Sequence, residues 1–231
     1  MNRVLAHTGA KYPILQAPMG WIARAQLASA VSRAGGLGII ETSSGETNNC
    51  QAEITKMGAL GLPFGVNLPI RFLRDDAMLK FVCASGVKFV TTSAGSPVKF
   101  IQPLKDAGII VYHAVPTVDA ARKCVDAGID GLVVEGAEGG GFKNPEEVST
   151  LVLLQAIRAC VDVPLIALAA SATAAAWRRR LRWGPKPSRW ARALSAVRKA
   201  RCMSITKMRL SRPRKPAPGC SMPNPPPAFA P

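Results

Sequence analysis

The stretch PILQAPMGWIARAQLASAVSRAGGLGII, residues 13–40, decides the fold. Short apolar runs at 13–16 and 37–40 flank the segment 22–35, whose apolar residues recur at helical spacing before a glycine pair. Two apolar strands joined by one amphipathic helix are typical of the βαβ unit of a parallel sheet. The sequence therefore predicts an α/β fold from its first forty residues.

The same alternation continues to residue 168. Further strands are predicted at 64–68, 87–92, 109–114, 131–136 and 164–168, and further helices at 50–59, 75–84, 97–107, after Thr117, and at 147–160. A spacing of about 20 to 25 residues fits both a barrel and a doubly wound sheet. Because no glycine-rich dinucleotide fingerprint follows the first strand, a (β/α)8 barrel of the TIM type is favoured. By this count the chain supplies seven barrel strands and is then truncated.

The charge distribution divides the chain after residue 167. Residues 1–167 hold 15 Lys and Arg against 14 Asp and Glu. Residues 168–231 hold 15 Lys and Arg, no acid, 10 of the 19 prolines and three of the four tryptophans. We therefore predict a partial barrel at 1–167 and a basic, irregular and disordered tail at 168–231 that adds no eighth strand. A nucleic-acid-binding tail is the alternative, which the lack of a DNA- or RNA-binding motif disfavours.

The sequence indicates a cytoplasmic protein. No long apolar run opens the chain, and none reaches the length of a membrane span, so we expect no signal peptide and no membrane partner. The six cysteines lie far apart without a CxxC pair, which favours free thiols and predicts no metal site. His7 precedes the first strand and is expected to be solvated.

Catalytic residues of a barrel lie at the carboxyl ends of its strands, and the residues predicted there are small and polar. They are 16–20, 41–45, Asn67, 91–95, His113 and 135–143. The set holds almost no titratable base, and His113 is expected to be a hydrogen-bonded barrel residue rather than a catalyst. These small, polar strand-end residues allow the close approach of a flat, hydrogen-bonding cofactor to the backbone. They are less suited to acid–base hydrolysis.

The opening stretch, with PFGVNL (63–68), GIDGLVVEGAEGGGFKN (128–144) and VPLIA (163–167), resembles the nitronate monooxygenase family, formerly called 2-nitropropane dioxygenases. The resemblance implies an FMN-dependent barrel related to flavin-dependent enoyl and quinone reductases. It places the isoalloxazine ring along the loop after the first strand, with further contacts at the third and sixth strands. The FMN-binding residues implied in this way are Ala17, Pro18, Met19, Gly20, Asn67, Glu135, Gly139, Gly140 and Gly141.

The resemblance implies oxidation of alkyl nitronates by dioxygen to a carbonyl compound and nitrite. The family's loop reads AGGH, with a histidine that acts as base or substrate anchor, but Phe142 stands at that position here. Phenylalanine cannot take a proton, so no catalytic residue is assigned and deprotonation of neutral nitroalkanes is not expected. Phe142 remains compatible with a small-molecule substrate that needs no base. Such a substrate is either a preformed nitronate or a quinone or enone reduced by NAD(P)H.

The tail is interpreted as out of frame. The family continues after the seventh strand with a Gly-Gly phosphate loop, a DGRGMAAALALGA helix and a QMGTRF strand, none of which occurs in this chain. Plausible codons for Leu168–Trp177, read two bases in, spell GGISDGRGM, and continuing through Arg201 permits AAALALGAEAVQMGTRFVSSAESPV. One G lost beside Ala167 accounts for the shift. The resemblance then implies an enzyme impaired by loss of its FMN phosphate half-site.

Overall fold

The structure is a computed structural model that describes residues 2–140, 146–168 and 190–193. The chain divides into two units, Met1–Ala196 and Val197–Pro231, and all the described residues lie in the first. Its helices are α1 (Arg3–Thr8), α2 (Ala25–Arg33), α3 (Thr47–Gly58), the 3₁₀ helix η1 (Ile70–Phe72), α4 (Ala77–Ala84), α5 (Val98–Asp106), α6 (Val118–Asp126) and α7 (Thr150–Cys160). Its strands are β1 (Ile14–Leu15), β2 (Gly38–Ile40), β3 (Phe64–Pro69), β4 (Phe89–Ser93), β5 (Ile110–Val115), β6 (Gly131–Glu135), β7 (Leu165–Leu168) and β8 (Trp190–Ala193).

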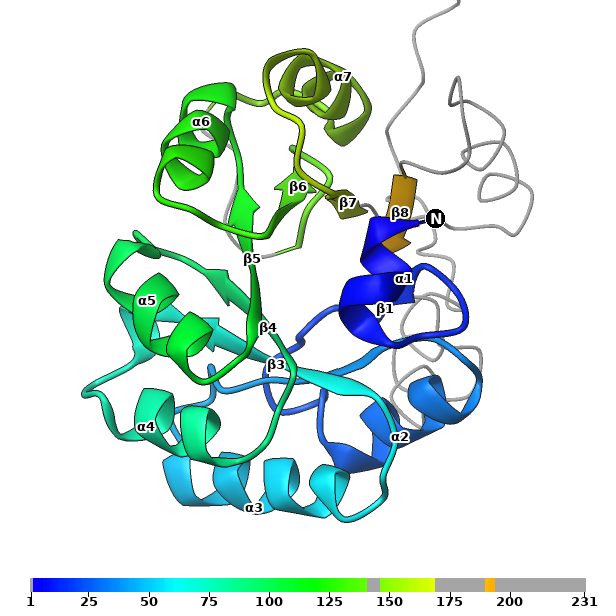
Figure 1. Ribbon diagram of the computed structural model, residues 1–231, viewed down its shortest axis with the longest axis vertical. Helices are drawn as coiled ribbons and strands as arrows, with labels where there is room; N and C mark the ends of the chain where they lie inside the picture. Colours follow the sequence, from blue (N-terminus) through cyan, green and yellow to red (C-terminus); the bar gives the residue numbers. More distant parts are fainter. Residues whose placement is uncertain (1, 141–145, 169–189, 194–231) are drawn as a thin grey trace, which may run out of the picture. The chain divides into compact units, whose positions relative to one another are not determined.

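The strands form one parallel sheet in the order β1-β8-β7-β6-β5-β4-β3-β2. A parallel bridge between Leu15 and Leu37 joins β1 to the chain that enters β2, with Gln16 N donating to Leu37 O at 2.9 Å. This bridge closes the sheet into a barrel, and Figure 1 shows α2 to α7 around the strands. The predicted TIM-barrel class and its seven strands are confirmed.

The eighth strand corrects one expectation. We predicted that the tail would not pair with the first strand, but β8 runs parallel to both neighbours, with Arg192 opposite Ile14 of β1 and Ala167 of β7. Seven strands leave main-chain groups of β1 and β7 without partners, and any short segment free of proline can pair with them through its own backbone. The predicted disorder falls on 169–189 and 194–231, outside the described residues, and the boundary at 167 and the out-of-frame origin stay predictions.

Two hydrophobic clusters result because alternate residues of each strand face opposite sides. The larger cluster lies between the strands and helices and includes Val66, Val90 and Leu132. The smaller one fills the barrel and includes Phe89 and Tyr112, whose ring centroids lie 4.9 Å apart. Large rings in the interior need small neighbours. A Cβ on Gly131 of β6 would lie 2.3 Å from Tyr112 Cζ, so glycine makes room for this ring.

Helix α1 contributes to the barrel core, although the sequence did not predict it. Val4 is 1% exposed and belongs to the same interior cluster as Tyr112. His7 of α1 lies with Nδ1 3.0 Å from the Tyr112 hydroxyl oxygen, and burial lowers the pKa of His7 below its ordinary value. The expectation that His7 would be solvated is therefore wrong, because α1 packs against the amino-terminal end of the strands.

Candidate functional site

The loop after β1 is held at the carboxyl end of the barrel by short-range hydrogen bonds. Met19 N donates to Ala17 O at 3.0 Å, and Ala23 N donates to Met19 O at 2.8 Å. Buried Gln16 donates through Nε2 to Ala17 O at 3.2 Å and to Ile39 O at 3.0 Å. Its Oε1 is buried, and no hydrogen-bond partner reaches it from the residues that the structure describes. The half-buried residues Ala17 to Gly20 thus present a fixed main chain to a ligand.

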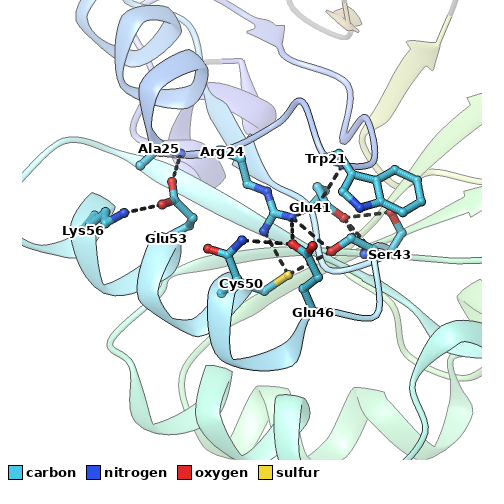
Figure 2. A network of polar contacts seen from close by, with 11 residues as sticks. Trp21, Arg24, Ala25, Glu41, Ser43, Glu46, Cys50, Glu53 and Lys56 are labelled. Atoms are coloured by element: carbon cyan, nitrogen blue, oxygen red, sulfur yellow. Dashed lines mark hydrogen bonds and ion pairs between the residues drawn. The ribbon is translucent and has the colours of Figure 1, made fainter.

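A buried carboxylate, Glu41, ties this loop to the loop after β2 (Figure 2). Glu41 is 0% exposed, and its Oε1 accepts from Trp21 N at 3.1 Å. Its Oε2 accepts from Ser43 N at 2.6 Å, from Ser43 Oγ at 2.8 Å and from Ser44 N at 3.1 Å. These donors replace the water shell that the carboxylate loses on burial.

Arg24, just before α2, supplies the countercharge. Its Nη2 lies 3.0 Å from Glu41 Oε1 and 3.0 Å from Glu46 Oε2, and it donates to Ser44 Oγ at 3.1 Å. Nη1 donates to the buried Cys50 Sγ at 3.2 Å. Burial alone lowers the pKa of Arg24, but Cys50, Glu41 and Glu46 together raise it above its ordinary value. The cluster is therefore a charged clamp between the first two strand ends and α3.

The same end of the barrel holds an amide on β3. Asn67 is 4% exposed, and its Nδ2 donates to Thr91 O at 3.1 Å, to Thr91 Oγ1 at 3.0 Å and to Ser93 Oγ at 3.4 Å. Thr42 Oγ1 donates to the main-chain oxygen of Asn67 at 2.7 Å. Among the described residues no donor reaches Asn67 Oδ1. The amide is thus oriented by Nδ2, and its oxygen is left as an acceptor for a ligand N–H.

The turn after β6 brings Glu135 beneath a glycine. A Cβ on Gly139 would lie 2.3 Å from Glu135 Oε1, so any side chain there would displace this carboxyl group. Burial raises the pKa of Glu135 above its ordinary value. A Cβ on Gly140 would meet nothing within 4 Å. Gly141 and Phe142, which were also predicted at the site, lie outside the described residues.

Thr150 at the start of α7 connects the ends of β6 and β7. Its Oγ1 accepts from Gly136 N at 3.0 Å and lies 2.9 Å from Leu168 O and 3.1 Å from Glu138 Oε2. Its main-chain N donates to the same Glu138 oxygen at 2.7 Å. Glu138 therefore accepts a hydrogen bond from the first residue of α7, next to the N-cap Ser149. This junction fixes the main chain where the β6 loop leaves the barrel.

His113 does not belong to the site. Its Nδ1 lies 2.8 Å from Oγ1 of Thr92, the residue opposite it on β4. Thr91 and Tyr112 face the interior, so by alternation Thr92 and His113 face the helices. Burial lowers the pKa of His113 to about 4, and the side chain is neutral at pH 7. The prediction of a hydrogen-bonded barrel residue is confirmed.

The barrel brings together Ala17 to Gly20, Asn67 and Glu135, each at the carboxyl end of a strand on the interior side. Sequence reasoning missed the roles of Arg24, Glu41 and Thr150. For Glu41 a signal existed, because an acid that directly follows a buried strand and precedes Thr-Ser-Ser has hydrogen-bond donors beside it in the chain.

The described residues fit the ring of a flavin. The site offers a fixed main chain at 17–20, an open amide oxygen at Asn67 and close approach near Gly139 and Gly140. A ring with both N–H donors and carbonyl acceptors uses such groups. Within 2–140, 146–168 and 190–193 no cluster of three or more His, Cys, Asp or Glu could hold a metal, and no helix there is long and apolar enough to cross a membrane.

A closed parallel barrel with small polar residues at the carboxyl ends of its strands defines the chain as a (β/α)8 barrel of the kind that binds ligands at this end. The family model described as nitronate monooxygenase matches residues 2–80 and 70–171. The chain belongs to the nitronate monooxygenase family, whose enzymes are flavin-dependent oxidoreductases.

Individual relatives agree with this assignment. The chain is 34% identical to the (3aS,4S,5R,7aS)-5-hydroxy-7a-methyl-1-oxo-octahydro-1H-indene-4-carboxyl-CoA dehydrogenase of Mycobacterium tuberculosis over 69% of this chain and 45% of that protein. It is 28% identical to the nitronate monooxygenase of Pseudomonas aeruginosa over 69% of this chain and 59% of that one. The chain thus spans about half the length of these curated relatives.

Solved structures give the same result. FabK from Thermotoga maritima superposes with a TM-score of 0.74 and 32% identity, covering 84% of this chain and 61% of that one. Nitroalkane oxidase from Streptomyces ansochromogenes superposes with a TM-score of 0.68 and 26% identity, covering 83% and 66%.

Proposed function

We propose that the intended reaction of this chain is the oxidation of alkyl nitronates with FMN as cofactor. The observation that carries the proposal is a set of fixed main-chain and amide groups at the strand ends, where no histidine of the described residues faces the interior. When bound, FMN supplies the redox chemistry, taking electrons from the nitronate and passing them to dioxygen to give a carbonyl compound and nitrite.

The chain's own residues would hold the ring. The main chain at Ala17 to Gly20 would lie along one edge of the ring, and Asn67 Oδ1 would accept a hydrogen bond from a ring N–H. Gly139 and Gly140 leave space above the Glu135 carboxyl group for the substrate carbon to approach. Fixing two reactants at contact distance and excluding water is the main contribution that such a scaffold makes.

The available groups favour a substrate that arrives deprotonated. His113 faces the helices, and Glu41 is occupied by four hydrogen bonds and an ion pair. Burial raises the pKa of Glu135, which lies beneath Gly139, and Phe142 stands at the position where the family carries its histidine. A nitronate needs no base, whereas a neutral nitroalkane does. Phe142→His should therefore raise activity on nitroalkanes more than on nitronates.

A reductase is the second candidate, acting on enones, quinones or acyl-CoA thioesters with NAD(P)H. It is favoured by identities of 34% and 33% to the two carboxyl-CoA dehydrogenases and 32% to FabK, against 26–28% to the nitronate and nitroalkane enzymes. The Glu135 carboxyl group, whose pKa is raised by burial, is also compatible with proton transfer during reduction of a carbon–carbon double bond.

The test compares this chain with a version in which the reading frame after Ala167 is restored. The implied phosphate half-site belongs to the restored segment, and each lost charge-assisted bond weakens binding by about 1.5–3 kcal/mol. We expect this chain to purify without FMN and the restored one to purify yellow, measured by absorbance after desalting. Nitronate-dependent oxygen consumption by the restored chain supports oxidation. Flavin bleaching by NADH without nitronate selects the reductase, and stoichiometric FMN on this chain contradicts the half-site argument.

The alternative of a nucleic-acid-binding tail has its own test. Steeply salt-dependent DNA affinity that is lost on deleting 168–231 would support it. Weak binding with no such dependence would leave the barrel as the functional part of the chain.

A further inference from the structure

Trp21 combines two features that rarely occur together. It has a backbone φ of 57°, in the left-handed region that a bulky L-residue adopts only at a cost in free energy. Its side chain is also among the most exposed large hydrophobic ones, at 67%. Strained backbone persists where the surroundings determine it, and it clusters at functional sites. An exposed indole gains little from folding, so packing does not explain this conformation.

The backbone of Trp21 is held by the buried clamp and not by its own side chain. Trp21 N donates to Glu41 Oε1, and the other Glu41 oxygen is held by Ser43 and Ser44 (Figure 2). The preceding Gly20 is packed so closely that a Cβ there would lie 3.2 Å from Ser43 Oγ. The clamp therefore fixes the point from which the indole projects.

The indole itself is uncommitted. Among the described residues no hydrogen bond or ring contact involves its side chain, so Nε1–H is free to donate to a ligand. The neighbouring Ile22 is 41% exposed and extends the apolar surface. Both residues directly follow Ala17 to Gly20, the segment proposed to lie along the flavin. An aromatic side chain with one donor thus directly follows the segment that is proposed to lie along the flavin.

We infer that Trp21 is the specificity-determining residue of the proposed site, selecting nitronates that carry an apolar chain or ring over those of one or two carbons. The inference rests on the proposed function for the position of the reacting carbon. The indole packs against the apolar group, and its N–H donates to a substrate oxygen. A small nitronate reaches the flavin without touching the indole.

The experiment uses Trp21→Gly in the chain whose reading frame after Ala167 is restored, because that chain is the one expected to hold FMN. Glycine adopts the observed φ without strain and keeps the main-chain bond to Glu41. Leu60→Ala is the matched control, since Leu60 is an exposed apolar residue (43%) in the loop between α3 and β3. The probes are the nitronates of 1-nitrohexane and nitroethane. We expect KM for the hexane nitronate to rise about tenfold in Trp21→Gly, the effect of losing one apolar contact, and KM for the ethane nitronate to change less than about twofold. Equal changes for both probes overturn the inference.

A second readout does not require turnover. In the ¹⁵N-tryptophan spectrum of the frame-restored chain with excess FMN, Trp21→Gly identifies the Trp21 indole signal. The hexane nitronate should shift this signal at concentrations where the ethane nitronate does not. A shift without oxidation of either nitronate refutes the proposed function and supports the role of Trp21. Oxidation without a shift refutes the role of Trp21 and supports the function, and the absence of both refutes both.

Discussion

Replacing Glu41 by leucine should destabilise the barrel by removing the centre of its clamp. The change deletes four hydrogen bonds, from Trp21 N, Ser43 N, Ser43 Oγ and Ser44 N, and the ion pair with Arg24. The Arg24 side chain is only 14% exposed, so it loses a buried partner and keeps the half-exposed Glu46. Removing one member of a buried pair costs about 3–5 kcal/mol, and we expect a loss in this range.

Two variants calibrate that number. Glu41→Gln keeps one acceptor oxygen and should cost about 1–3 kcal/mol, since its amide group faces some of the donors. Glu46→Gln changes the partner whose side chain is 47% exposed and should cost less than about 1 kcal/mol.

The assay is urea unfolding followed by far-UV circular dichroism, with hydrogen exchange of the 17–24 segment as a local measure. We expect the Trp21 amide to exchange faster in Glu41→Leu than in Glu46→Gln. A Glu41→Leu variant within about 1 kcal/mol of the parent, with unchanged exchange at Trp21, would refute the clamp.

Three further predictions concern the barrel. Gly131→Ala places a Cβ against Tyr112 and should lower the free energy of unfolding by about 1–3 kcal/mol. The loss should be smaller in a Tyr112→Leu background, and equal losses in both backgrounds contradict the packing argument. Because the pKa of His113 is about 4 when folded and near 6.5 when unfolded, the unfolded state takes up the proton first, so stability falls from pH 6.5 toward pH 4. His113→Gln should reduce this loss of unfolding free energy by about 3 kcal/mol, as measured by urea melts between pH 6.5 and pH 4. Equal losses in the parent and in the variant would contradict this prediction. Thr150→Val leaves Gly136 N without its acceptor and should lower the free energy of unfolding by about 1–3 kcal/mol in thermal or urea melts. Thr150→Ser should stay close to the parent, and a valine variant as stable as the serine variant would refute the stabilising role of this hydrogen bond.

The seven strands and their helices were predictable because their signals are local. Each βα unit carries its own apolar run, helical spacing and terminal glycine within about 25 residues. Helix α1 escaped notice because it has only six residues, too few for a periodic pattern. Strand β8 escaped because it pairs through its main chain, which leaves no trace in side-chain composition.

The site was predictable in part. Strand ends located Ala17 to Gly20, Asn67 and Glu135 at one end of the barrel. The sequence did not show whether His113 faces the barrel interior or the helices. Strands of a parallel barrel are apolar on both sides, so the two faces do not differ in residue type. The Glu41 clamp joins residues from three elements, and its donors at Trp21 and Arg24 become neighbours only after the first two strands have paired.

The position of β8 also bears on how genes for such barrels change. Its neighbours β7 and β1 pair with it through main-chain groups, so the pairing itself demands no particular side chains in the closing strand. A barrel whose sheet is closed in this way can change the sequence of its last strand, or carry an unrelated C-terminal extension, without presenting an open edge that aggregates.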